Sequence, residues 1–295
     1  GGGKVINAPK EKNVHMDILF KDASDRLVAM EMTTAALTLP EPWAALDPKN
    51  PAYGGDIDWS ALDAKSASHR KFMQAVKIYQ LNKMATALGS AWSGQSIDPA
   101  SIRMRADAFS APAARALENL GFQLDLSNGT RITAGQIVFE QSIGPKKVAE
   151  LHKVFGAAGA AKFVDEVGSD RAIQLVSGPT SISVAELKDL ADKLGNDVLK
   201  NLAYTTSGLS GKDILDLVKS HGEAAVRWAG KNLQGNEAKA LLVALNKDSA
   251  KHLQDLAADR AGTLVKELGR DLVNAVAPTI GGSRLATLQE LLGTE

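Results

Sequence analysis

The stretch that decides the fold class of the first part of the chain is residues 14–33, VHMDILFKDASDRLVAMEMT. Two apolar runs, 14–20 and 27–33, flank a polar segment that is rich in Asp and Ser. Val, Ile, Phe and alternating apolar residues are typical of strands, whereas Asp and Ser are typical of turns. The pattern therefore predicts a β-hairpin whose turn is centred on Ser24.

The register of this hairpin brings polar side chains together. With the turn at Ser24, Asp17 faces Glu31 across the two strands, and His15 faces Thr33. Because successive side chains of a strand alternate between its faces, all four polar side chains are expected on the same, solvent-facing side. The opposite, buried face is expected to carry Met16, Ile18, Phe20, Val28, Met30 and Met32.

Two carboxylates that face each other across a hairpin repel each other. Their Cβ atoms are expected to lie about 5 Å apart, which raises the pKa of at least one of them. A divalent cation removes this repulsion, and Mg²⁺ binds one or two protein carboxylates together with water and substrate phosphate. Asp17 and Glu31 therefore predict a site for Mg²⁺ or Mn²⁺. The alternative is that both acids are simply solvated on an exposed face, as charged residues usually are.

The elements that follow the hairpin predict a mixed sheet flanked by helices, and thus an α+β domain. Ser127-Asn128-Gly129 is a typical hairpin turn between two further strands. The pattern predicts helices over residues 66–88 and 111–120 and strands over residues 4–8, 102–109, 122–126 and 131–139.

Residues 39–63 are rich in proline and too irregular for a helix or a strand, so we expect an insertion loop. The loop contains the aromatic residues Trp43, Tyr53 and Trp59. Aromatic side chains in such a loop either stack on a nucleotide base or hold the loop against its own domain, and the second is the more common. The acidity of the loop argues against nucleic acid there and favours a protein partner such as an inhibitor. Its acidic residues include Asp47, Asp56, Asp58 and Asp63.

The character of the sequence changes at residue 144, after which only short helical runs follow. Gly168, Gly195 and Gly222 recur at equal spacing. Each glycine is expected to end one helix in a left-handed conformation, and the polar residue after it to begin the next. Such short helices bury their apolar sides only by stacking in an array. We therefore predict an α+β domain over residues 1–143 and an all-helical accessory domain, without a catalytic cluster, over residues 144–295.

The composition excludes several classes of site. The chain has no cysteine, which excludes disulfides, thiol nucleophiles and cysteine-bound zinc. Its five histidines form no HxxxH or HExxH pair. The formal net charge is zero, so nucleic-acid binding must come from a local patch. No apolar run reaches the roughly 20 residues that span a bilayer, and no membrane partner is expected.

The order of these elements resembles a known family over roughly residues 4–125. A strand with Asp17, a turn, a strand with Glu31, a polar helix, and a further strand and helix resemble the PD-(D/E)XK nuclease superfamily, with its restriction-endonuclease-like fold. The resemblance implies that Asp17 and Glu31 bind Mg²⁺ or Mn²⁺. It also implies that the metal activates the water that attacks a phosphodiester.

The sequence departs from the family pattern at Thr33, where the family usually has a lysine that orients the water and stabilises the developing charge. Lys71 on the following helix, or His15, is expected to take that role. Without such a replacement the site is expected to be inactive.

Nucleic-acid contacts are expected from polar side chains on the next two elements. Arg70, Gln74 and Lys77 form one stripe along the first helix, and Arg103 and Arg105 share one face of the strand that follows it. Each set has the chemistry to contact phosphate. The alternatives are a solvated helix face and a surface edge of the sheet.

The texture of the helical part resembles linker and pre-toxin regions of bacterial polymorphic toxins. This implies a nuclease that is secreted or delivered into the cytoplasm of a target cell and has an immunity protein as inhibitor. Otherwise a cytoplasmic nuclease is expected, with DNA ahead of RNA as substrate. One competing hypothesis is an inactive, nuclease-like module that binds a protein partner, which Thr33 favours. The other is an unrelated enzyme or binding domain.

Overall fold

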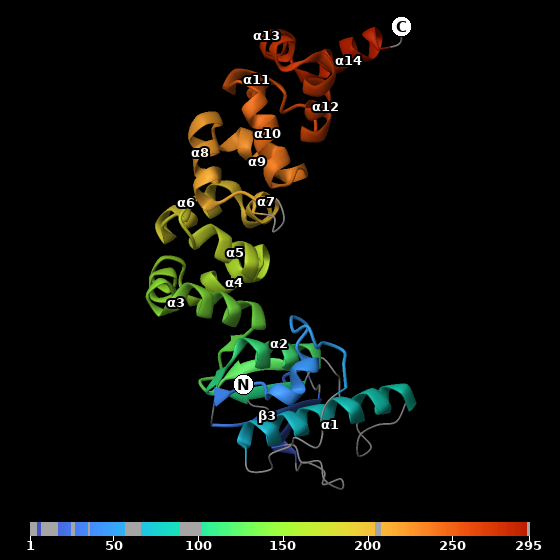
Figure 1. The fold of residues 1–295 in the computed structure, drawn as a ribbon, viewed down its shortest axis with the longest axis vertical. Helices are drawn as coiled ribbons and strands as arrows, with labels where there is room; N and C mark the ends of the chain where they lie inside the picture. Colours follow the sequence, from blue (N-terminus) through green and yellow to red (C-terminus); the bar gives the residue numbers. More distant parts are fainter. Residues whose placement is uncertain are drawn as a thin grey trace. The chain divides into compact units, whose positions relative to one another are not determined.

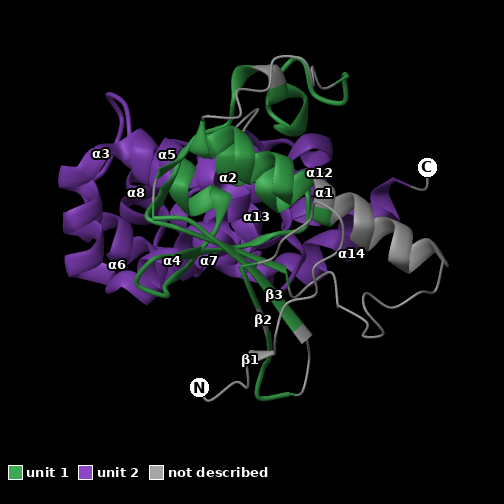
Figure 2. Ribbon diagram, turned by 90° about the horizontal axis from the view of Figure 1, so that it is seen from below, with its two compact units in different colours: residues 1–138 green, residues 139–295 purple. Residues whose placement is uncertain are grey.

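The structure is a computed structural model with two compact units, residues 1–138 and 139–295, each with its own apolar core (Figures 1 and 2). Unit 1 contains a mixed sheet with helices and unit 2 is a series of helices, so the predicted α+β and all-helical parts are both present. The structure describes residues 5–6, 17–24, 27–34, 36–56, 66–88, 102–203 and 208–293.

Unit 1 is built on a six-stranded sheet with the order β1-β2-β3-β5-β7-β8. The pairs β1/β2, β2/β3 and β7/β8 are antiparallel, whereas β3/β5 and β5/β7 are parallel. A helix therefore connects each parallel pair, as such crossovers require. The strands are β1 (Val5–Ile6), β2 (Ile18–Lys21), β3 (Leu27–Met32), β5 (Ile102–Ala106), β7 (Gln123–Leu126) and β8 (Arg131–Ile132).

The remaining elements of unit 1 pack on one face of this sheet. β4, which follows β3 in the chain, and β6, which precedes α2, form a separate two-stranded parallel pair. The buried residues of α1 and α2 join those of β5 and β7 in a single core cluster. These elements are β4 (Ala36–Leu37), β6 (Ala108–Phe109), the 3₁₀ helix η1 (Glu41–Leu46), α1 (Ala67–Leu88) and α2 (Ala111–Asn119).

The register of the β2/β3 hairpin is the predicted one, because Ile18 pairs with Met30 and Phe20 with Val28. The predicted division into a buried and a solvent-facing side is wrong. Val28 and Met30 are buried as expected, but Glu31 on the other face is only 1% exposed. Strands inside a sheet with parallel pairs are covered on both faces, and here α1 covers the face that carries Glu31.

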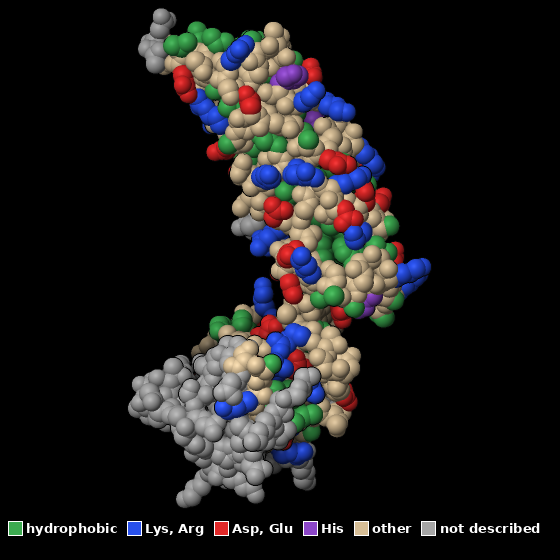
Figure 3. All heavy atoms as spheres, turned by 180° about the vertical axis from the view of Figure 1, so that it is seen from behind, with side chains coloured by type: hydrophobic (Ala, Val, Ile, Leu, Met, Phe, Trp, Pro, Cys, Tyr) green, Lys and Arg blue, Asp and Glu red, His purple; other side chains and the backbone are tan. Residues whose placement is uncertain are grey.

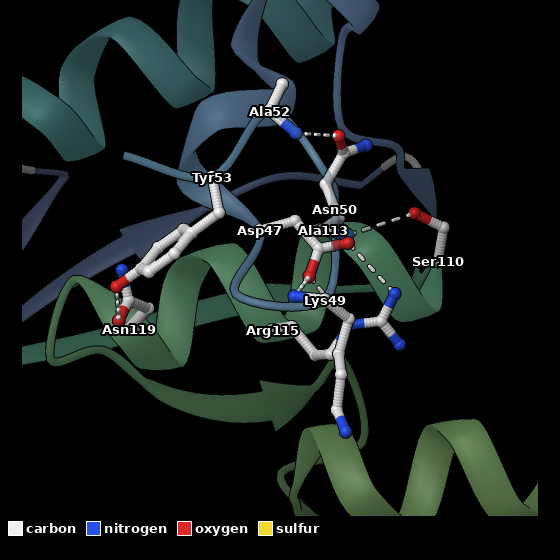
Figure 4. A network of polar contacts seen from close by, with 9 residues as sticks. All are labelled: Asp47, Lys49, Asn50, Ala52, Tyr53, Ser110, Ala113, Arg115 and Asn119. Carbon is white, nitrogen blue, oxygen red and sulfur yellow. Dashed lines mark hydrogen bonds and ion pairs between the residues drawn. The ribbon is translucent and has the colours of Figure 1, made fainter. Parts of the chain in front are cut away.

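The loop after β4 is held against unit 1. Trp43 is fully buried and lies edge-on to Phe72 of α1, with ring centroids 6.0 Å apart. Asp47 accepts two hydrogen bonds from the Arg115 guanidinium of α2, so its charge is neutralised inside the protein (Figure 4). The exposed ring of Tyr53 donates its hydroxyl hydrogen to Asn119 Oδ1 at 3.2 Å. The loop is thus pinned to its own domain.

One of the predictions for the loop changes in consequence. Asp47 does not contribute to an acidic surface, because it is 3% exposed and paired with Arg115. Asp56 is exposed as expected. The predicted loop residues Asp58, Trp59 and Asp63 lie outside the described residues.

The predicted strand over residues 131–139 is wrong after Ile132, because α3 (Ala134–Phe155) begins there. Thr133 and Gln136 explain the start, since each side chain accepts a hydrogen bond from the backbone N–H of the other. The two units divide between Val138 and Phe139, inside this helix, whereas the sequence predicts the boundary after residue 143. At Gly144 the helix is interrupted, with φ 78° and ψ 162°.

Unit 2 is an array of helix pairs with one continuous core. Hydrogen bonds link corresponding places in neighbouring pairs, for example from Asn201 Nδ2 to Gly230 O and from Asn274 Nδ2 to Ala244 O. The helices are α4 (Ala157–Val167), α5 (Ser169–Val176), α6 (Val184–Leu194), α7 (Asn196–Leu202), α8 (Gly211–His221), α9 (Glu223–Asn232), α10 (Gly235–Ala244), α11 (Lys247–His252), α12 (Ala258–Leu268), α13 (Arg270–Ile280) and α14 (Gly282–Leu292). None of the helices in the described ranges is long and apolar enough to cross a membrane.

Single glycines join the helices of several pairs. Gly168, Gly195 and Gly222 have φ between 87° and 93°, as the sequence predicts, and ψ between 141° and 160°. This combination is extended with a positive φ and differs from the expected left-handed helical conformation. It is open almost exclusively to glycine. The joint glycines therefore set the direction in which each second helix leaves the first.

Candidate functional site

Three charged side chains of unit 1 meet at the open end of the β2/β3 hairpin. Lys71 Nζ lies 2.7 Å from Asp17 Oδ2 and 3.0 Å from Glu31 Oε2. Asp17 immediately precedes β2, Glu31 lies on β3, and Lys71 lies in the second turn of α1. We call these residues the Asp17–Glu31–Lys71 triad. Lys71 thus lies between the two carboxylates, and the catalytic role expected of it stays a prediction.

Backbone geometry fixes each member of the triad. The hairpin register carries Asp17 to the level of Glu31, and Asp17 Oδ2 also accepts a hydrogen bond from the backbone N–H of Met32 at 2.8 Å. The start of α1 places Lys71 over β3, since Ser66 Oγ accepts from the backbone N–H of His69. The next residue of the helix, Phe72, is buried in the core, and Lys71 lies at the edge of this core, where it is partly exposed.

The three groups differ in exposure, and their pKa values shift accordingly. The Glu31 side chain is 1% exposed, that of Lys71 18% and that of Asp17 40%. Burial, with the nearby charge of Asp17, raises the pKa of Glu31 to about 7, although Lys71 opposes the shift. Burial also acts to raise the pKa of Asp17, but hydrogen bonds from Lys71 and Met32 outweigh it and hold that pKa below its usual range.

The Lys71 ammonium shows the complementary shift. Burial acts to lower its pKa, but the hydrogen bonds and charges of Asp17 and Glu31 prevail and raise it. Lys71 is therefore charged at all physiological pH values. Around neutral pH, Glu31 is the member of the triad that exchanges its proton.

The chemistry of the site fits a divalent cation in one respect. Glu31 Oε1 is buried and has no hydrogen-bond partner among the described residues, so one carboxylate oxygen remains available as a ligand. Asp17 is partly exposed beside it. No group of three or more His, Asp or Glu side chains suited to a metal occurs within the described ranges. A hard cation here would therefore depend on water and substrate for most of its ligands, as Mg²⁺ commonly does.

The other expected site residues lie at different distances from the triad. Thr33 follows β3, and its backbone N–H donates to Arg105 O at 2.9 Å. On α1, Arg70 is exposed and Gln74 is half-buried. His15 and the side chain of Lys77 lie outside the described residues.

Arg103 and Arg105 are not brought to the triad. In the parallel β3/β5 pair, Arg103 stands beside Met30, whereas Met104 stands beside Glu31. Paired residues of neighbouring strands point to the same face, so both arginines lie on the face of the sheet opposite Glu31. Arg103 and Arg105 can therefore contact the same nucleic acid as Arg70 only if that nucleic acid reaches both faces of the sheet.

No family model, no curated protein and no solved structure matches the chain.

Unit 2 offers a different kind of surface. Lys and Arg side chains alternate with Asp and Glu over the face that Figure 3 shows, with no region of a single charge. Several of these residues form ion pairs one helical turn apart on the same helix. Of the described histidines in this unit, His221 is held by Ser220 Oγ and by Leu245 O. Trp228 packs at the edge of the core and donates its indole N–H to Leu256 O.

Proposed function

We propose that the chain is a metal-dependent nuclease whose reaction takes place at the Asp17–Glu31–Lys71 triad. The observation that carries the proposal is the position of the Lys71 ammonium within hydrogen-bonding distance of both carboxylates. The order of elements that supply Asp17, Glu31 and Lys71 adds support, because two hairpin strands and the helix that follows them are the elements that the family resemblance implies.

Each member of the triad has a separate role in the proposed reaction. Asp17 and Glu31, through its free Oε1, would hold Mg²⁺ or Mn²⁺, which would supply Lewis-acid stabilisation of the phosphate charge. Lys71 compensates the two negative charges in the free protein, and its ammonium can turn toward a bound phosphate. Because Glu31 binds its ligand as the anion, its pKa of about 7 makes cation binding stronger as the pH rises through neutrality.

A cleavage assay with supercoiled plasmid and with RNA, in the presence of Mg²⁺ or Mn²⁺, tests the proposal. Glu31→Gln keeps the shape of the side chain and is expected to lower the rate by at least about 100-fold, and Lys71→Met by a similar factor. Glu140→Gln, which removes a carboxylate of unit 2, is the matched control and should leave the rate unchanged. Intact nucleic acid with the wild-type protein would refute the enzymatic function. Full activity of Glu31→Gln would refute this site.

The second candidate is an inactive module that binds a protein partner. Lys71 favours it, since an ammonium already satisfies both carboxylates without a metal. The two candidates differ in their response to divalent ions. A nuclease site should gain thermal stability with Mg²⁺ or Mn²⁺, and Glu31→Gln should lose that gain. Equal melting temperatures with and without ions, together with no cleavage, would favour the inactive module.

The cellular setting belongs to the same proposal. A secreted or delivered nuclease needs a protein inhibitor in the cell that makes it, and unit 2 would then serve as its accessory part. Co-expression of a candidate inhibitor that restores growth to cells producing the wild-type chain would support this setting. Growth of cells that produce the wild-type chain alone would contradict it.

A further inference from the structure

A row of charged side chains crosses the sheet of unit 1 on the face opposite the triad. Arg105 on β5 pairs with Asp125 on β7, and Asp125 pairs with Arg131 on β8. Arg103 lies two residues before Arg105 on the same strand and therefore shares its face. Three arginines thus surround a single aspartate, which leaves an excess of positive charge on this part of the sheet.

The aspartate forms ion pairs with two of the three arginines but is hydrogen-bonded to one of them. Asp125 Oδ1 accepts a hydrogen bond from Arg131 Nε at 2.9 Å. Arg103 Nη1 is 3.7 Å from Asp125 Oδ2, which is too long for a hydrogen bond. The carboxylate therefore neutralises one of the three guanidinium charges: it is hydrogen-bonded to Arg131 and forms a longer ion pair with Arg103, while its buried Oδ2 has no hydrogen-bond partner among the described residues.

Arg103 and Arg105 each keep a buried donor without an acceptor. The Nε atoms of both are buried and have no hydrogen-bond partner within the part of the chain that the structure describes. The side chain of Arg105 makes no ion pair there either. Buried donors without acceptors are rare, because burial removes their water and nothing replaces it. Arg105 therefore has no counter-anion among the described residues, and Arg103 has only the more distant Oδ2 of Asp125.

Solvent reaches the row from outside. The side chain of Arg103 is 28% exposed and that of Arg131 46%, whereas that of Asp125 is 3% exposed. The carboxylate thus lies at the base and the guanidinium groups lie at the surface. The exposed parts of Arg103 and Arg131 are therefore more accessible to an anion from solvent than the carboxylate of Asp125 is.

We propose that Arg103, Arg105 and Arg131 form a binding site for a phosphate group. Guanidinium groups are planar, carry fixed pairs of N–H donors and bind phosphate oxygens two at a time. A cation is excluded by the excess positive charge. The phosphate belongs either to a nucleic-acid backbone or to a small phosphate, since both present the same oxygens. The site lies across the sheet from Glu31, so it binds without taking part in cleavage and does not depend on it.

The test compares full-length wild-type protein with Arg105→Gln and with Arg284→Gln, which removes an exposed arginine of α14. Binding of a short fluorescent oligonucleotide is measured in EDTA over a series of salt concentrations, and the melting temperature is measured with and without inorganic phosphate. Arg105→Gln is expected to weaken binding about tenfold and to lower the slope of log affinity against log salt by about one. It should also lose the melting-temperature gain that phosphate gives the wild type. Arg105→Lys should restore part of the affinity, and Arg284→Gln should behave as wild type.

Each outcome decides the proposal. Loss of oligonucleotide binding alone assigns the site to a nucleic-acid backbone, and loss of the phosphate effect alone assigns it to a small phosphate. Equal behaviour of Arg105→Gln and wild type in both measurements would overturn the site. If the wild type binds through Arg105 but cleaves no nucleic acid, the proposed nuclease is refuted and the phosphate site is supported. If the wild type cleaves nucleic acid but does not bind through Arg105, the phosphate site is refuted and the nuclease is supported.

Discussion

Glu31 shows how a single residue can be costly for the fold and useful for a reaction. Its carboxylate lies under α1, with one oxygen bonded to Lys71 and the other without a partner among the described residues. Burial of a partly satisfied carboxylate is unfavourable for its charged form. The protein therefore keeps Glu31 partly protonated at neutral pH, and a cation that binds the free oxygen would release that proton.

The stability of unit 1 should consequently fall as the pH rises. The pKa of Glu31 is about 7 in the folded protein, compared with 4.5 for an ordinary glutamate, which represents the unfolded chain. Between pH 4.5 and about pH 7 the folded state therefore binds more protons than the unfolded state. The free energy of unfolding should drop by about 2–3 kcal/mol from about pH 5 to about pH 8. Urea unfolding across this range measures the drop. Glu31→Gln should flatten the curve, and an unchanged slope in this variant would contradict the assignment.

Removal of the Lys71 ammonium, which Asp17 and Glu31 share, should lower the free energy of unfolding more at high pH than at low pH. Lys71→Met leaves Asp17 and Glu31 without their common partner and should lower the free energy of unfolding by about 1–3 kcal/mol near pH 8. Near pH 5 the loss should shrink, because Glu31 is then protonated. Chemical denaturation at the two pH values measures both effects. Lys251→Met, an exposed lysine of α11, is the control and should change stability by less than about 0.5 kcal/mol at either pH.

At the scale of the elements, the joint glycines of unit 2 make a sharp contrast with glycine inside a helix. Gly222 joins α8 to α9 with φ 87° and ψ 160°, and a Cβ there would meet no atom within 4 Å. Gly262 lies inside α12, and a Cβ there would also meet nothing. Steric contact is therefore equal at the two positions, and only backbone conformation differs.

Alanine at the two glycines should have opposite effects. Gly222→Ala should destabilise unit 2 by about 1–3 kcal/mol, because alanine avoids this conformation. Gly262→Ala should stabilise it by about 0.5–1 kcal/mol, since alanine favours helix and restricts the unfolded chain. Thermal denaturation of both variants provides the comparison. Stabilisation by both substitutions would show that the joint tolerates a side chain.

The elements also show how far the sequence predicts the structure. The β2/β3 register follows from local alternation and from the turn at Ser24, and the place of Lys71 follows from the chemistry that two acids need. The burial of Glu31 could not be predicted, because it depends on α1 packing onto β3 from far along the chain. Arg103 and Arg105 are predicted from the sequence as phosphate contacts, whereas Arg131 is not, because it joins them only after β7 has paired with both β5 and β8.

At the scale of the whole molecule, two separate cores predict two separate unfolding events. Leu117 of α2 and Leu199 of α7 are both fully buried, and each belongs to a different core. Leu117→Ala should lower one calorimetric transition and Leu199→Ala the other, each by about 2–5 kcal/mol of unfolding free energy. Differential scanning calorimetry of the two variants checks this. A single transition that both substitutions shift equally would show that the cores unfold together.

The joint glycines have a further consequence for how such an array can change its length. Gly195 and Gly222 place one backbone conformation at the same point of two successive helix pairs. Deletion of residues 196–222 would connect α6 to α9 through a glycine joint of the same kind, although α9 would lose the close contact of Gly230 with Val198 and Leu202 of α7. The backbone at the joints therefore permits the loss or gain of complete modules by recombination, and the side chains at the new interface decide whether the shortened array is stable.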